Sequence, residues 1–121
     1  MTKRILVVED QEDNRQILRD LLTHAGYEVI EIDNGEQAFP AAAEHRPDLI
    51  LMDIQLPLLD GYQATKRIKA DPTLKHIPII VVTSYALSGD EAKARNAGCD
   101  AYVAKPFSPR ALLNKIRQFA G

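Results

Sequence analysis

Five short aliphatic runs recur along the chain, separated by longer stretches with a different period. They cover residues 5–8, 29–32, 49–52, 79–82 and 101–104. The first, third and fourth runs are apolar throughout, which is typical of parallel strands covered by helices on both faces. The second and fifth runs are mixed, which favours positions at the edges of a sheet. The pattern therefore predicts five strands, with the second and fifth outermost.

The stretches between these runs carry helical periodicity. The first predicted helix has one apolar stripe and ends at Gly26. The stripe consists of Ile17, Leu18, Leu21, Leu22 and Ala25. A second helix is predicted over residues 35–45, but it contains Pro40. Because proline lacks an N–H and crowds the preceding turn, we expect this helix to be kinked or to start late. On the same argument, Pro40→Ala is predicted to raise the melting temperature.

Three further helices follow, each with a recognisable boundary. The third covers residues 61–70 and places Ala64 and Ile68 on one side. The fourth begins with the capping box Ser88-Gly89-Asp90-Glu91 and ends at Gly98. The fifth opens with Ser108-Pro109, a capping residue followed by proline at the first helical position. Regular alternation of strand and helix predicts an α/β fold built on a parallel sheet with right-handed crossovers.

Length and composition restrict the classes of protein that fit. The 121 residues suffice for one domain, over residues 1–121, and the formal net charge is −2. Without a block of Lys and Arg, the chain is not expected to bind nucleic acid or an anionic membrane. Cys99 is the only cysteine, which excludes an internal disulfide and favours a reducing, cytoplasmic location. No apolar run is long enough to cross a bilayer.

Chemistry-bearing residues follow the predicted strands at their carboxyl ends, where parallel sheets gather ligands. They are Glu9 and Asp10 after the first strand, Asp53 after the third, Thr83-Ser84 after the fourth, and Lys105 after the fifth. Three carboxylates at one place would repel each other, and a hard cation such as Mg²⁺ compensates for this. Lys105 adds a point charge and Thr83 a hydroxyl donor, both suited to phosphoryl oxygens. Each residue alone has an ordinary role as a cap or a solvated charge, but together they indicate phosphoryl transfer.

At this point the chain resembles the receiver domain of two-component response regulators over essentially its whole length. The matching stretches are ILVVED, PDLILMDIQLPLLDGYQATKRI, PIIVVTSYA and AGCDAYVAKPF. The resemblance implies a doubly wound, flavodoxin-like (βα)5 fold with strand order 2-1-3-4-5. It implies that the protein acts as a single-domain regulator in a two-component system or phosphorelay. The expected partners are a sensor histidine kinase or a histidine phosphotransfer protein.

The resemblance also implies a role for each matching residue. Asp53 accepts a phosphoryl group from a phosphohistidine, with Thr83 and Lys105 on the phosphoryl oxygens. Mg²⁺ is held by Asp10, by Asp53 and by the carbonyl of Gln55, with Glu9 nearby through water. The Lys105–Pro106 bond is cis. Thr83 and Tyr102 form a switch that alters the face built from the fourth helix, the fifth strand and the fifth helix, where a downstream protein would bind.

Two alternatives from other classes are weighed against this interpretation. One is a small acyl-phosphate phosphatase; the D-x-D signature of the dehalogenase type is missing, because Ile54 and Gln55 follow Asp53. The other is a binding module that is never phosphorylated, which would not need Lys105, Thr83 and Asp10 together. Tyr85 is expected to obstruct attacking water, so we predict a durable phosphorylated state and no enzymatic activity beyond self-phosphorylation and slow autodephosphorylation.

Overall fold

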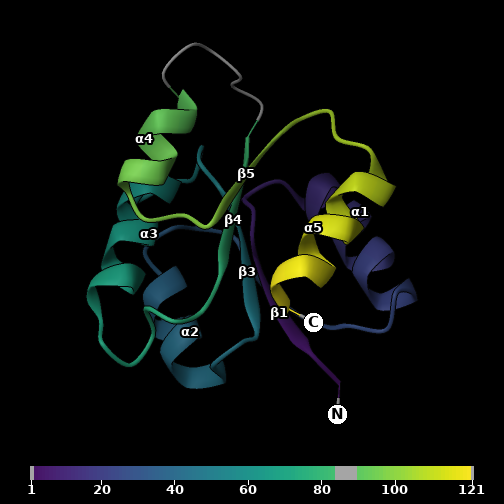
Figure 1. The fold of residues 1–121 in the computed structure, drawn as a ribbon, viewed down its shortest axis with the longest axis horizontal. Coiled ribbons are helices and arrows are strands. Elements are labelled where there is room, and N and C mark those ends of the chain that lie inside the picture. The colour runs from purple at the N-terminus through teal and green to yellow at the C-terminus, as the bar shows by residue number, and fades with distance from the viewer. Residues whose placement is uncertain (1, 84–89, 121) are drawn as a thin grey trace.

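The strands and helices follow the predicted order. The computed structural model describes residues 2–83 and 90–120 (Figure 1). Its strands are β1 (Arg4–Val8), β2 (Glu28–Ile32), β3 (Leu49–Asp53), β4 (Ile79–Thr83) and β5 (Ala101–Ala104). Its helices are α1 (Glu12–His24), α2 (Ala38–His45), α3 (Gly61–Ala70), α4 (Asp90–Asn96) and α5 (Pro109–Ala120). The capping box expected at Ser88 lies outside the described residues.

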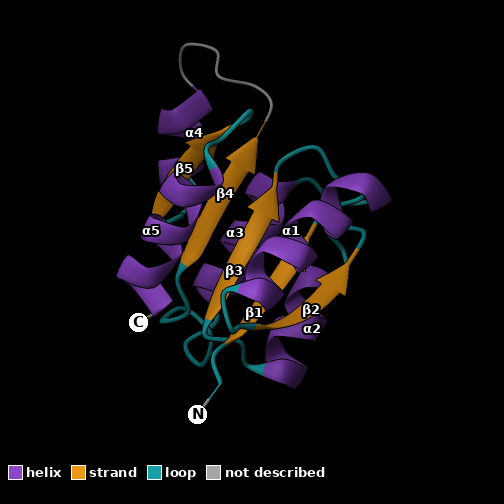
Figure 2. Ribbon diagram, turned by 90° about the vertical axis from the view of Figure 1, so that its right-hand side faces the viewer, coloured by secondary structure: helices purple, strands orange, loops and turns teal. Residues whose placement is uncertain are grey.

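The strands form one parallel sheet in the order β2-β1-β3-β4-β5. This confirms the expected fold and the edge positions of β2 and β5. All five strands point the same way, so their carboxyl ends share one edge of the sheet (Figure 2). Every residue of β3 and β4 is buried. The continuous apolar runs therefore follow from burial on both faces of the sheet.

Two apolar cores lie on opposite faces of the sheet. Helices α2, α3 and α4 cover one face, and α1 and α5 cover the other (Figure 1). Alternate strand residues serve the two sides: Leu6 and Ile50 belong to the first core, Ile5 and Leu49 to the second. This is the two-residue period of a strand applied to two apolar layers. The sheet is thus fixed from both sides, and its carboxyl edge is a rigid base for side chains.

Helix α1 differs from its prediction at one residue. Leu18 and Leu22 are buried against the sheet, and Leu21 and Ala25 pack beside them. Ile17, expected in the same stripe, is 59% exposed. Neighbouring residues on a helix are separated by about 100°, so a stripe centred on Leu18 and Leu22 turns Ile17 toward solvent. Ile17 therefore belongs to the surface of the molecule.

Helix α2 starts late, as Pro40 indicated. Asn34 accepts a hydrogen bond from the Gln37 N–H at 2.9 Å and closes a turn, and the helix begins only at Ala38. Pro40 is then the third helical residue. Since N–H groups in a first turn have no partner within the helix, the missing donor is harmless there. The expectation that Pro40 destabilises the fold is therefore revised.

Candidate functional site

The predicted polar residues meet at the carboxyl edge of the sheet. Carboxylate oxygens of Glu9, Asp10 and Asp53 all lie within 4.8 Å of one another. Glu9 and Asp53 are buried, whereas Asp10 is exposed. The central strands β1 and β3 are hydrogen-bonded neighbours, so residues at their ends are brought together by the sheet itself. The result is an acidic pocket that opens to solvent on the side of Asp10.

Lys105 directly follows the edge strand β5, and its side chain reaches the carboxylates at the ends of β1 and β3. Its Nζ lies 2.8 Å from Glu9 Oε1 and 3.7 Å from Asp53 Oδ2. Its backbone N–H donates to the Thr83 carbonyl at 2.7 Å, which extends the pairing of β4 with β5. The Lys105–Pro106 peptide bond is cis. Thr83, at the end of β4, is fully buried.

Asp53 is held by its own backbone and by a close approach of helix α3. Its Oδ1 accepts a hydrogen bond from the Ile54 N–H at 2.8 Å, which leaves Oδ2 on the side of Lys105. A Cβ at Gly61 would lie 2.1 Å from the Asp53 carbonyl oxygen, so only glycine fits there. The neighbouring Asp60 caps α3 by accepting from the Gln63 N–H at 2.9 Å. The Asp-Gly pair thus starts the helix and lets it pass directly over the end of β3.

The clustering of charge changes the acidity of each carboxyl group. Burial, reinforced by the negative charge of Glu9, raises the pKa of Asp53 to about 6. Burial and Glu9 also raise the pKa of Asp10. Burial acts to raise the pKa of Glu9 as well, but hydrogen bonds from Lys105 and the Gln11 N–H outweigh it and lower that pKa. One lysine therefore offsets only part of the negative charge of three carboxylates.

The donor set fits a magnesium ion. Its side-chain members are all carboxylate oxygens, the hard ligands that Mg²⁺ prefers, and the exposed Asp10 leaves room for the waters that this ion retains. The pKa of Asp53 is raised although Lys105 lies nearby, so the pocket has too little positive charge for its carboxylates. A divalent cation would supply more. Gln55 lies two residues beyond Asp53 and is exposed. Its proposed carbonyl ligand role stays a prediction.

Tyr102 lies in the edge strand, away from the acidic pocket. It is half-buried, packs against the core shared by α2, α3 and α4, and is paired in register with Val81 of β4. Thr83 and Ala104 form the last pair of the same two strands. Tyr102 is thus linked to the pocket through β4 and β5. Tyr85 and Ser84 lie outside the described residues.

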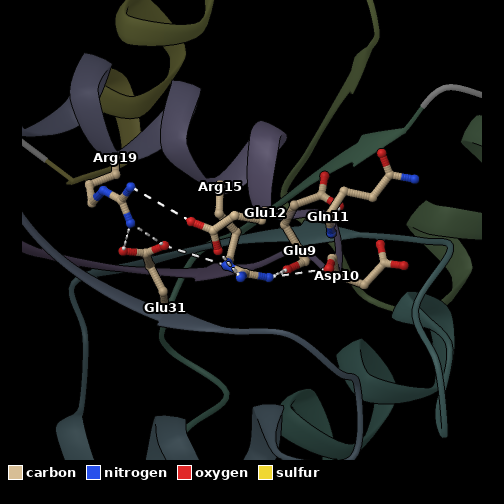
Figure 3. A network of polar contacts seen from close by, with 7 residues as sticks. All are labelled: Glu9, Asp10, Gln11, Glu12, Arg15, Arg19 and Glu31. Atoms are coloured by element: carbon tan, nitrogen blue, oxygen red, sulfur yellow. Dashed lines mark hydrogen bonds and ion pairs between the residues drawn. The ribbon is translucent and has the colours of Figure 1, made fainter.

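Arg15 contacts the backbone of the acidic loop, Glu9 and Asp10 directly after β1, and this contact was not anticipated from the sequence (Figure 3). Its Nη1 donates to the carbonyl oxygens of Glu9 at 2.9 Å and of Asp10 at 3.2 Å. Backbone acceptors leave no trace in the residue pattern, so an arginine on a charged helix looks like any solvated side chain. The only sequence signal for this contact was the position of Arg15, about one turn into the helix that follows Glu9 and Asp10.

The fold and the pocket define a flavodoxin-like α/β domain with an acidic cluster at the carboxyl edge of its sheet, and the ligand types of this cluster fit a hard cation. Within this class, the chain belongs to the response regulator receiver domain family, whose model matches residues 5–117. The family acts in two-component signalling, where receiver domains interact with histidine kinases or phosphotransfer proteins and bind Mg²⁺ at the acidic pocket.

Individual relatives agree along the whole chain. The polar-differentiation response regulator DivK of Brucella anthropi is 48% identical over 121 residues, which cover 100% of this chain and 98% of DivK. The receiver domain of a Pseudomonas aeruginosa sensor histidine kinase, solved with a magnesium ion in its active site cleft, is 39% identical. Its TM-score is 0.93, with 100% of this chain and 99% of that chain covered. The phosphorylated cyanobacterial phytochrome response regulator RcpA is 28% identical, with a TM-score of 0.84 and coverage of 98% and 91%.

Proposed function

We propose that Asp53 is the phosphoryl acceptor of this response regulator. The observation that carries the proposal is the position of its carboxylate. Oδ1 is fixed by the Ile54 N–H, and Oδ2 lies 3.7 Å from the Lys105 ammonium inside the acidic pocket. With a pKa of about 6, Asp53 is mostly ionised at neutral pH, so it needs no general base to act as a nucleophile.

The chemistry follows from this arrangement. An Asp53 oxygen attacks phosphorus, the bond between phosphorus and the histidine nitrogen breaks, and its electron pair remains on the imidazole. The product is an acyl phosphate on Asp53. The Lys105 Nζ lies 2.8 Å from Glu9 and 3.7 Å from Asp53, which supports the expectation that its ammonium contacts a phosphoryl oxygen. The Thr83 hydroxyl would donate to a second oxygen.

Asp10, Asp53 and the Gln55 carbonyl would hold the Mg²⁺ ion, with Glu9 nearby through water. When bound, the ion supplies positive charge that reduces repulsion between the anionic nucleophile and the anionic phosphoryl group. The three carboxylates lie close enough together to share one cation. Lys105 already pairs with Glu9. The carboxylates with the greater need for a second cation are therefore Asp10 and Asp53, whose pKa values are raised.

We further propose that the phosphohistidine partner docks in a groove beside the acidic pocket. It has a volume of about 470 Å³ and is lined mainly by apolar residues of α1 and of the connection from β5 to α5. The lining residues are Asn14, Ile17, Leu18, Lys105, Pro106, Phe107 and Pro109. Lys105 borders both the groove and the acidic pocket, so a partner bound there would bring its histidine toward Asp53. The exposed Ile17 is the natural apolar contact.

The remaining assignments concern output and location. We propose that a downstream protein binds the face formed by α4, β5 and α5, where Tyr102, Pro106 and Arg110 lie. We also expect a cytoplasmic protein that binds neither nucleic acid nor membrane, in keeping with a net charge of −2. Among residues 2–83 and 90–120, no helix combines the length and apolarity needed to span a bilayer.

Mass spectrometry tests the acceptor assignment. Incubation with Mg²⁺ and a small phosphodonor should add one phosphate to the native chain and to the control Asp20→Asn, whose carboxylate is exposed on α1. Asp53→Asn should take up none. Uptake that persists in Asp53→Asn would overturn the assignment. Loss of the phosphate within seconds would favour the acyl-phosphate phosphatase instead, because Tyr85 is predicted to slow hydrolysis.

A further inference from the structure

Arg15 ties together three parts of the chain at the back of the acidic loop. Its side chain is only 15% exposed. The Nη1 atom donates to the carbonyl oxygens of Glu9 and Asp10, at 2.9 Å and 3.2 Å. The Nη2 atom donates to Glu12, and Nε lies 3.5 Å from Glu31 on the edge strand β2. Arg15 thereby joins the end of β1, the start of α1 and β2.

Contact with two consecutive carbonyls constrains the loop conformation. In an extended strand successive carbonyls point in opposite directions, so one nitrogen cannot reach both. Here Arg15 Nη1 does reach both, because the backbone bends directly after β1. The Glu9 N–H still donates to the Ile32 carbonyl at 3.1 Å, which anchors the near side of the bend. Figure 3 shows the Asp10 carboxylate pointing away from Arg15, and this side chain is exposed to solvent.

The charge of Arg15 is compensated locally. Glu12 and Glu31 flank its guanidinium, and Arg19 pairs with Glu31 through contacts of 2.9 Å and 3.1 Å (Figure 3). Two arginines and two glutamates thus form a network without net charge. Arg15 therefore acts on the loop mainly through hydrogen bonds to its carbonyls. Arg19 shares the ion pairs of this network, but it is not among the groups that contact the Glu9 and Asp10 carbonyls.

We propose that Arg15 is a positioning residue that preorganises Glu9 and Asp10 for magnesium binding. The inference rests on the proposed function, in which these carboxylates surround the cation. Groups that orient metal ligands without touching the metal typically change its affinity by about 10- to 100-fold. Without Arg15, the ion itself would have to order the loop. The conformational entropy lost in ordering it would make the free energy of Mg²⁺ binding less favourable.

Magnesium titration calorimetry on four chains tests the proposal: native, Arg15→Ala, Arg15→Lys and Arg19→Ala. We expect Arg15→Ala to bind Mg²⁺ about 10-fold more weakly or worse, while Arg19→Ala stays close to native. Arg15→Lys keeps the charge, but one ammonium lacks the fork of donors that reaches two carbonyls and Glu31 together. Its affinity should therefore also fall, and this variant provides the test if Arg15→Ala does not fold by circular dichroism.

Amide hydrogen exchange of the metal-free chains gives a second readout. The Gln11 N–H donates to Glu9 Oε2 at 3.1 Å in the present loop, so it should exchange faster in Arg15→Ala than in Arg19→Ala. Native affinity in both Arg15 variants, or an equal loss in Arg19→Ala, would overturn the inference while leaving the acceptor role of Asp53 intact. Failure of the native chain itself to bind Mg²⁺ would instead overturn the proposed metal site and this inference with it.

Discussion

The surroundings of Asp53 disfavour the ionised form of its carboxyl group when no cation is bound. Asp53 is 9% exposed and its carboxylate lies beside Glu9; the Lys105 ammonium, 3.7 Å from Oδ2, offsets only part of this negative charge. Its pKa of about 6 compares with an ordinary value of 3.8. That difference corresponds to about 3 kcal/mol against the ionised form. The proposed phosphoryl acceptor is therefore also a source of instability in the metal-free protein at neutral pH.

The first stability prediction concerns Asp53→Asn. The folded state holds the Asp53 proton more tightly than the unfolded chain, so the stability that Asp53 contributes is complete below about pH 4 and is lost as the pH rises through 6. At pH 7.5 without Mg²⁺, Asp53→Asn should therefore unfold with a free energy about 2–3 kcal/mol higher than native. At pH 4, close to the ordinary pKa of 3.8, the difference should shrink to about 0.5 kcal/mol. Urea unfolding in chelator measures both values.

Two further measurements make this test specific. The exposed control Asp20→Asn should change little at either pH. Saturating Mg²⁺ should stabilise the native chain more than Asp53→Asn, because the ion compensates the charge only where the carboxylate is present. An Asp53→Asn variant that is no more stable than native at pH 7.5 would contradict the conclusion that the ionised Asp53 destabilises the metal-free fold.

At the scale of elements, side-chain patterns predicted the strands well but placed several ends one residue short. The observed β1 and β2 begin one residue earlier, at Arg4 and Glu28, and β3 and β4 extend to Asp53 and Thr83. These polar residues continue the backbone ladder, which hydrophobicity does not report. Ile17 was assigned to the buried stripe for a related reason. Periodicity gives the phase of a helix only to within about one residue.

The late start of α2 leads to a prediction about Pro40. Proline at the third helical residue loses no helical hydrogen bond and restricts the unfolded chain, so Pro40→Ala should lower the free energy of unfolding by about 0.4–1 kcal/mol. The control Ala41→Pro lies one residue further on, where the N–H donates to the Gln37 carbonyl at 3.0 Å. It should cost about 3 kcal/mol or more. Chemical unfolding of both variants measures these values, and a more stable Pro40→Ala would mean that the ring is strained.

The candidate site divides in the same way between what residue types reveal and what the backbone decides. Asp10, Asp53 and Lys105 were identifiable because a strand end is a position in the sequence, and a parallel sheet brings strand ends together. Gly61 and Arg15 act on backbone atoms, the Asp53 carbonyl in one case and the Glu9 and Asp10 carbonyls in the other. Such roles depend on how close two segments approach, which only the folded chain shows.

For the whole molecule, the connection between β5 and α5 belongs to two surfaces. Lys105 and Pro106 line the groove proposed for the histidine partner, and Pro106 also belongs to the proposed output face. A donor and a downstream protein would therefore compete for this segment. The backbone gives the pocket a short path to the same face, since the Lys105 N–H donates to the Thr83 carbonyl and Tyr102 pairs with Val81.

The last prediction follows that path. A phosphoryl group on Asp53 gives the Thr83 hydroxyl a new acceptor, which should draw it toward the pocket and let Tyr102 rotate further inward. Two states separated in this way typically couple ligand and partner by about 1–3 kcal/mol, so affinity for an output partner should rise about 5- to 150-fold. An amide-shift map with and without beryllofluoride, a phosphoryl mimic, should show changes at Tyr102 and along α5. Thr83→Ala should restrict the changes to the loops around Asp53, because it removes the hydroxyl but leaves the acceptor site. If the native chain also responds only in those loops, the switch is wrong, and a protein that merely passes the phosphoryl group on is the better description.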